Sequence, residues 1–167
     1  MAETQESPAN TLCKSCGLCC TGHLFIWGKL RSAELDSAAA LGLNVSRAPR
    51  QRGFSQPCPL WQGQCTIYYS PHYPRFCRTY KCKLLKQILD ENTLLPDALQ
   101  LIEGAKGLIH DVESLLPPSP LTNFRERLVS HLDGQELSET EFSGKARDLL
   151  VFYEEVFGVD DLIDPPE

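Results

Sequence analysis

The most reactive part of this sequence is a group of four cysteines within eight residues, CKSCGLCC at 13–20. Two cysteines separated by two residues can direct their sulfurs toward one point, because the short chain between them turns tightly and its amides face the sulfurs. The motif contains this spacing twice, first from Cys13 to Cys16 and then from Cys16 to Cys19. One such pair at each end suffices for a zinc knuckle, whereas three cysteines in this register are typical of a [4Fe-4S] cluster.

Four further cysteines lie downstream, and one of them, Cys58, precedes a proline as remote ligands of [4Fe-4S] clusters often do. Cys20 cannot easily share a ligand position with Cys19, because neighbouring side chains usually diverge. We therefore expect zinc or an iron-sulfur cluster, in one or two centres, with four sulfurs for each tetrahedral ion or cubane. The predicted groups are Cys13, Cys16, Cys19 and Cys58 in one, and Cys20, Cys65, Cys77 and Cys82 in the other.

The rest of the chain argues against a disulfide framework. The first ten residues, MAETQESPAN, lack the basic and apolar regions of a secretory signal. No apolar run approaches the ~20 residues needed to cross a bilayer, so we expect no membrane partner. We expect a cytoplasmic protein, whose thiols are kept reduced, and there clustered cysteines more often indicate metal or redox chemistry than disulfides.

The net charge of -6 conceals two oppositely charged halves. Residues 1–90 contain 11 Lys and Arg against 5 Asp and Glu (+6), and residues 91–167 contain 5 against 17 (-12). The basic residues follow the cysteines in sequence and form no dense run, so they favour charge compensation of thiolates over a nucleic-acid interface. The basic residues beside cysteines are Lys14, Arg75, Arg78, Lys81 and Lys83.

Other side chains near the cysteines are candidates to support a metal. Basic side chains between the last two cysteines can offset thiolate charge, and tyrosines can donate hydrogen bonds or, by core packing, exclude water. A histidine three residues beyond Cys20 is an alternative ligand in place of one cysteine. These residues are Arg78 and Lys81, Tyr68 and Tyr80, and His23.

The elements that must position the cysteines differ between the two halves. After a frayed tail, Pro and Gly residues predict a loop-rich region over 12–82, including a basic loop at 44–56. A helix is expected from Ser32 as N-cap to Gly42. The second half has helical periodicity. Its expected helices are 77–91, Pro96 to the PPSP at 117–120, Thr122 as N-cap through Leu132, and one from a capping box of Ser138 and Glu141 to Phe157.

These patterns predict a mainly α fold with an irregular, loop-rich metal-binding region. It is either a small single α+β domain or an all-α one, with a C-terminal helical bundle. A chain of 167 residues with 42% hydrophobic residues suits one compact domain. The expected parts are a disordered tail at 1–11, a cysteine-cluster region at 12–86, a helical region packed on it at 87–160, and a tail at 161–167.

The order of the cysteine motifs resembles that of a known family. CKSCGLCC, CPLW (58–61), GQCTIYY (63–69) and PRFCRTYKC (74–82) are similar to the motifs of the CxxCxxCC zinc- or iron-chelating domain family, the YkgJ-type cysteine-cluster proteins. The resemblance covers residues 12–86 and all eight cysteines, and it implies that they chelate zinc or iron. This chain departs from the family at Tyr73-Pro74, where an Arg-Pro pair is common.

Three functions are compatible with this resemblance. The first is a metalloprotein with a structural, metal-handling or redox-sensing role. The second follows from a larger relative of the family, the flagellin lysine N-methylase, which uses an iron-sulfur centre with S-adenosylmethionine; this chain lacks a G-x-G-type nucleotide loop in its C-terminal helices. The third is a metal-stabilised adaptor whose acidic helices bind a basic protein partner.

Overall fold

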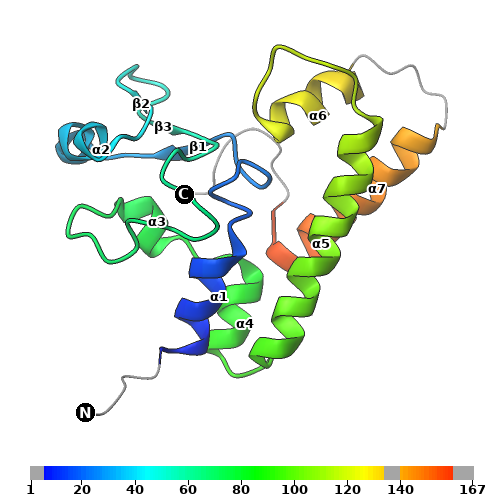
Figure 1. The fold of residues 1–167 in the computed structure, drawn as a ribbon, viewed down its shortest axis with the longest axis horizontal. Coiled ribbons are helices and arrows are strands. Elements are labelled where there is room, and N and C mark those ends of the chain that lie inside the picture. The colour runs from blue at the N-terminus through cyan, green and yellow to red at the C-terminus, as the bar shows by residue number, and fades with distance from the viewer. Residues whose placement is uncertain (1–5, 134–139, 160–167) are drawn as a thin grey trace.

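The computed structural model describes residues 6–133 and 140–159 (Figure 1). Within these ranges the chain forms seven α-helices, two short helices of other types and one three-stranded sheet, which confirms a mainly α fold with a small sheet. The elements are α1 (Pro8–Cys16), β1 (Trp27–Lys29), the 3-10 helix η1 (Ser32–Glu34), α2 (Leu35–Leu41), β2 (Val45–Ser46), β3 (Gly53–Ser55), α3 (Arg75–Thr79), α4 (Lys83–Leu89), α5 (Leu95–Leu115), α6 (Phe124–Asp133), α7 (Glu141–Phe152) and the π-helix η2 (Tyr153–Phe157).

The small sheet has the antiparallel order β1-β3-β2, with α2 and α3 near it (Figure 1). Strands β2 and β3 lie in the segment 44–56 that we expected to be loop, because Phe54 of β3 is buried in a separate small core with residues that include Leu43. The helix expected from Ser32 is present, but its N-cap is Arg31, and Ser32 is the first residue of its first turn. Its first turn has 3-10 geometry, and Gly42, with φ 103°, ends it as predicted.

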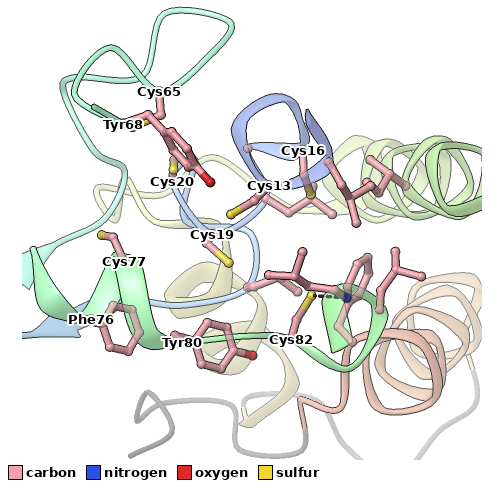
Figure 2. Close-up of a pocket in the computed structure, with 18 of the residues that line it drawn as sticks. Cys13, Cys16, Cys19, Cys20, Cys65, Tyr68, Phe76, Cys77, Tyr80 and Cys82 are labelled. Carbon is pink, nitrogen blue, oxygen red and sulfur yellow. Dashed lines mark hydrogen bonds between the residues drawn. The ribbon is translucent and has the colours of Figure 1, made fainter. Parts of the chain in front are cut away.

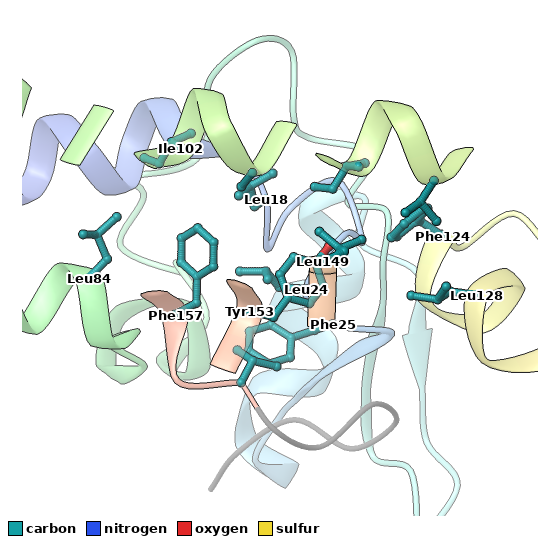
Figure 3. Close-up of a cluster of buried hydrophobic side chains, with 14 of the residues drawn as sticks. Leu18, Leu24, Phe25, Leu84, Ile102, Phe124, Leu128, Leu149, Tyr153 and Phe157 are labelled. Carbon is teal, nitrogen blue, oxygen red and sulfur yellow. The ribbon is translucent and has the colours of Figure 1, made fainter. Parts of the chain in front are cut away.

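The second half of the chain consists of helices around the long α5, which packs against α7 and α1 (Figure 1). The largest core also includes Leu18 and Leu24 from the cysteine-bearing turn, and these pack with Leu149 and Phe157 (Figure 3). The cysteine region and the helical region therefore share one core. Among the helices of the described residues, none combines the length and the apolar character that a membrane span requires.

The N-terminus is ordered earlier than expected. Residues 8–11, assigned to a frayed tail, belong to α1, because Pro8 occupies its first turn and the Ser7 hydroxyl accepts a hydrogen bond from the Asn10 amide at 3.2 Å. Ala9 and Leu12 of this helix are buried in the main core. Core packing therefore extends the folded chain beyond the boundary that composition indicated.

The helix expected over 77–91 is two helices. Helix α3 ends at Thr79 and α4 begins at Lys83, and the residue before α4, Cys82, is extended with φ -66° and ψ 164°. The Cys82 sulfur accepts a hydrogen bond from the Leu85 amide at 3.4 Å and so caps α4. Because of this break, Cys82 is the N-cap of α4 and does not lie in the interior of a helix.

Two predicted N-caps are also displaced. Asn123, not Thr122, caps α6, because its Oδ1 accepts hydrogen bonds from the Arg125 and Glu126 amides at 2.8 and 3.2 Å. Helix α7 is capped by Thr140, which forms a reciprocal capping box with Ser143. The predicted cap Ser138 lies outside the described residues. The predicted end of this last helix at Phe157 is confirmed, with its final turn in π geometry.

The turn after α1 gives a testable stability difference. Gly17 ends α1 at φ 72°, and a Cβ there would lie 2.2 Å from Cζ2 of Trp61. Gly63 has a similar φ of 76° but nothing within 4 Å of its would-be Cβ. A left-handed backbone costs an L residue roughly 1–2 kcal/mol, and the clash adds to that only at Gly17. We expect Gly17→Ala to lower the free energy of unfolding by about 3 kcal/mol or more and Gly63→Ala by about 1 kcal/mol, measured by urea unfolding. Equal losses would contradict the close packing of Trp61 on Gly17.

Candidate metal centre

The cysteines are positioned by separate segments of the chain that meet beside α1 (Figure 2). Cys13 and Cys16 lie in the last two turns of α1, where residues three apart share a face, so this pair is helical and not the tight loop that we predicted. After Gly17 the chain turns and brings Cys19 and Cys20 to the same place, with the Thr21 amide bonded to the Gly17 carbonyl at 2.8 Å. The others come from the β3–α3 loop (Cys58 and Cys65), from α3 (Cys77) and from the cap of α4 (Cys82).

Seven of the eight cysteines line one cavity of about 80 Å³. The eighth, Cys58, lies beside it, because its amide donates a hydrogen bond to the Cys20 carbonyl at 2.6 Å. All eight are free thiols of intermediate exposure, and none forms a disulfide. The seven cysteines of the cavity are Cys13, Cys16, Cys19, Cys20, Cys65, Cys77 and Cys82.

The rest of the cavity wall is almost entirely apolar. Leucines such as Leu12 and Leu84 line it. The ring of Phe76 stacks on that of Tyr80, with centroids 5.6 Å apart (Figure 2). One polar side chain breaks this pattern: Gln56 is 6% exposed, and its Oε1 has no hydrogen-bond partner within the described part of the chain. A buried, unsatisfied acceptor at a cavity is costly unless a ligand, water or ion completes it.

The turn that carries Cys19 and Cys20 is held from the helical side. Arg125, which is fully buried, donates from Nη1 to the Leu24 carbonyl at 3.0 Å. The Tyr153 hydroxyl donates to the carbonyl of the preceding residue, His23, at 2.6 Å. Helix α6 and the π-helix η2 therefore fix the backbone just beyond the adjacent cysteines.

Burial raises the pKa of every thiol in the cluster above its ordinary value near 9. The pKa of Cys13 rises to about 11 and that of Cys16 to about 12, chiefly through desolvation and also through repulsion from neighbouring thiolates. The pKa of Cys19 and of Cys77 rises further, for the same two reasons. Without a compensating cation these sulfurs are therefore protonated near neutral pH.

Mutual repulsion between thiols, which raises their pKa values, indicates two overlapping groups. Cys16 and Cys19 are both affected by Cys82 and by Cys13, whereas Cys77 is affected most by Cys20. The groups are not separate, because Cys13 also acts on Cys20 and Cys77, and Cys16 acts on Cys20. A grouping on this basis would exchange Cys58 and Cys82 between the two sets that we predicted. The first group is Cys13, Cys16, Cys19 and Cys82, and the second group is Cys20, Cys58, Cys65 and Cys77, with Cys13 also coupled to Cys65.

Backbone amides favour the charged form of four of these sulfurs. In each case an N–H two or three residues further along the chain lowers the thiol pKa against the larger effect of burial. Such donors stabilise thiolates and commonly support metal-bound cysteines. The pairs are Cys16 with Leu18, Cys58 with Leu60, Cys65 with Ile67, and Cys82 with Leu85.

The cations that act on the cluster differ from those next to cysteines in sequence. Lys14 forms an ion pair with Glu6 at 2.9 Å, and its position over the Tyr69 ring keeps it on the surface. The cations that lower thiol pKa values are Lys106 of α5, at Cys16, and Lys86 of α4, at Cys82. We predicted neither of them from the sequence. Tertiary packing brings Lys106 to the cluster, whereas Lys86 lies four residues after Cys82 on the same helix, a spacing that could have identified it.

His23 is not a wall residue of the cysteine cavity. Its Nδ1 lies 2.6 Å from the Thr21 hydroxyl and its Nε2 lies 3.0 Å from a Glu113 carboxylate oxygen. Its ring also packs against Phe124, with centroids 5.2 Å apart. The alternative in which His23 replaces a cysteine ligand is therefore not supported by its position.

The donor set matches zinc or an iron-sulfur cluster in chemistry and in number. Thiolate sulfur is the ligand that both prefer, and each needs four. In the conformation described, no three Cys, His, Asp or Glu side chains of residues 6–133 and 140–159 lie close enough together to hold one ion. Ligation would therefore require the sulfurs to move inward.

Comparison of the chain with family models, curated proteins and solved structures finds no match.

The buried thiols make the metal-free protein sensitive to alkali. Because folded thiols hold their protons more tightly than unfolded ones, the folded state binds more protons between about pH 9 and about pH 12. The free energy of unfolding of the chelated, reduced protein is then greatest below about pH 9 and falls by several kcal/mol as pH rises through that window, since each pKa unit is ~1.4 kcal/mol. Burial also raises the pKa of Tyr73 and Tyr80, which act in the same direction. Urea unfolding at a series of pH values measures this loss, and a free energy of unfolding that stays constant would contradict it.

Proposed function

We propose that this chain is a cysteine-cluster metalloprotein whose two groups of four sulfurs bind zinc or iron, in a structural, metal-handling or redox-sensing role. The observation that carries the proposal is the convergence of seven cysteines, from segments as far apart as Cys13 and Cys82, on one cavity with a mostly apolar wall. Cysteines that serve only as small apolar side chains need no such gathering. We expect the thiols to act in the cytosol, where they are kept reduced.

The size of the cavity favours a polynuclear iron-sulfur centre over single zinc ions. Four sulfurs at about 2.3 Å surround a zinc ion so closely that no further space remains between them. A cavity of about 80 Å³ has room for several atoms, since one water needs only ~10–15 Å³ on the same measure. The apolar wall also suits a centre that must be shielded from water. When bound, an iron-sulfur centre supplies either a structural cross-link or one-electron chemistry.

The protein's own residues would do three things for such a centre. Backbone amides such as that of Leu85 donate to the sulfurs, the Phe76 and Tyr80 rings exclude water, and the helical core fixes the turn that carries the adjacent cysteines. The positive charge of the metal would replace the protons that burial otherwise holds on the thiols. Metal loading is therefore expected to release protons and to stabilise the fold.

Anaerobic purification followed by metal analysis, acid-labile sulfide analysis and an absorption spectrum tests the proposal. Iron and labile sulfide in similar amounts, with a broad visible absorption, support the iron-sulfur form. A colourless protein with two zinc ions supports the zinc form and excludes the preference drawn from cavity size. A protein that binds neither metal after reconstitution, while keeping its circular-dichroism spectrum, would refute metal binding altogether.

A further inference from the structure

A second cavity, of about 300 Å³, adjoins the cysteine cavity and shares part of its wall. We call it the vestibule; its defining residues are Tyr68, Tyr73, Arg78, Tyr80 and Lys81. It is wider than the cysteine cavity and has a more polar wall. The two cavities share the three tyrosines, so the vestibule opens onto the cluster.

The vestibule places its contents next to both groups of sulfurs. Cys13 of the first group and Cys77 of the second group line both cavities. A molecule that fills the vestibule would therefore lie against one sulfur of each group. The cysteine cavity by itself, with its smaller volume, has no comparable space for an organic molecule.

The charged residues that line the vestibule are both positive. Arg78 and Lys81 are its charged wall residues, and no Asp or Glu among the described residues lines it. Both side chains are exposed, and within the described part of the chain neither forms an ion pair. Two cations beside a low-dielectric wall attract anions and repel bare metal cations.

The vestibule wall is held in place before any ligand binds. The Tyr68 hydroxyl donates to Asn10 Oδ1 on α1 at 3.0 Å, and the Tyr68 ring lies 5.5 Å from that of Tyr73. The neighbouring Tyr69 hydroxyl donates to Glu6 at 2.5 Å, which ties the same loop to the N-terminal end of α1. A preformed aromatic wall reduces the ordering cost of binding.

We propose that the vestibule binds a small organic oxyanion, a carboxylate or a phosphate ester, with its charged head on Arg78 and Lys81 and its apolar body against the tyrosine rings. Arginine presents a planar fork that matches both kinds of oxyanion, and lysine adds a second positive charge. Binding itself depends only on the vestibule, whereas the placement of the ligand beside a metal rests on the proposed function. The ligand is thereby held where it can reach a centre on Cys13 or Cys77.

Titration of the purified holoprotein with benzoate, phenyl phosphate and the neutral benzyl alcohol, followed by calorimetry or ligand-observed NMR, tests this site. We expect at least one of the two anions to bind at least tenfold more tightly than benzyl alcohol. Whichever of benzoate and phenyl phosphate binds more tightly identifies the preferred head group. Arg78→Gln/Lys81→Gln should weaken anion binding at least tenfold, because it removes both charge-assisted contacts. The matched control Arg75→Gln/Lys83→Gln changes two exposed cations that do not line the vestibule, and it should bind as the wild type does.

Three results would overturn the site: no binding of either anion, equal binding of benzyl alcohol, or unchanged anion affinity in Arg78→Gln/Lys81→Gln. Metal content is measured on the same samples. If that variant loses its metal as well, Arg78 and Lys81 compensate thiolate charge and do not serve a ligand. If instead the wild type holds no metal but still binds the anions through these residues, the proposed function fails while the oxyanion site stands.

Discussion

Cys16→Ser/Cys82→Ser is expected to lose one metal centre and keep the other, whereas Cys16→Ser/Cys58→Ser is expected to lose both. We assign Cys16 and Cys82 to the first group because α4 packs against α1 and the two thiols repel each other, and Cys58 to the second because its amide bonds to the Cys20 carbonyl. Serine cannot replace a thiolate ligand of zinc or iron-sulfur centres effectively, so each group loses its centre when one or two members are replaced. The grouping expected from sequence spacing predicts the opposite result for the two double variants.

The effect on stability should follow the metal. Structural metal sites in small domains contribute on the order of 10 kcal/mol, so loss of both centres should unfold the cysteine region. Loss of one centre should lower the midpoint of thermal unfolding and leave a folded protein. Metal and sulfide per chain, with the circular-dichroism spectrum, are the measurements.

A control variant lies within the same motif. Ser15 is exposed on α1 between two cysteines, so Ser15→Ala should keep full metal content. If Cys16→Ser alone and Cys58→Ser alone each lose all metal, the cysteines form one shared polynuclear centre and not two separate ones. Retention of both centres in Cys16→Ser/Cys58→Ser would refute the assignment of these cysteines as ligands.

Asn123→Ala should destabilise the protein as much as the loss of a buried core side chain does, because Asn123 makes three kinds of contact at once. The Asn123 Nδ2 donates to the carbonyls of Phe25 and Gln56, both at 3.2 Å, while its Oδ1 caps α6. Alanine would leave two buried carbonyls without these donors and remove the cap, each at about 1 kcal/mol or more. We expect the free energy of unfolding to fall by about 3 kcal/mol or more in urea unfolding. Because Gln56 lines the cysteine cavity, metal should also dissociate faster.

Thr122→Ala is the matched control for this substitution. Thr122 precedes Asn123, is exposed, and is the residue that the sequence pattern favoured as the cap. We expect its free energy of unfolding to stay within ~0.5 kcal/mol of the wild type. If Thr122→Ala lowers the free energy of unfolding as much as Asn123→Ala does, the hydrogen bonds from Asn123 to the Phe25 and Gln56 carbonyls do not contribute the stability assigned to them.

Local patterns in the sequence determined the parts of the fold that depend on near neighbours along the chain. Helix α5 starts at Leu95, one residue before the predicted Pro96, and ends before PPSP, because proline constrains its own backbone and that of the preceding residue. Gly42 and Phe157 end their helices as predicted. The turns that direct amides at the sulfurs are also local, and the choice of the cysteines as the reactive set needed only their spacing.

Tertiary structure alone decided which cysteines lie together and what surrounds them. Cys82 joins the first group because α4 packs against α1, and Cys58 joins the second because its amide bonds to Cys20. The vestibule exists because a loop bearing Tyr68 closes against Asn10, 58 residues away. Spacing and periodicity describe residues within about one or two turns of each other, whereas these contacts depend on how distant segments bury their apolar faces against one another.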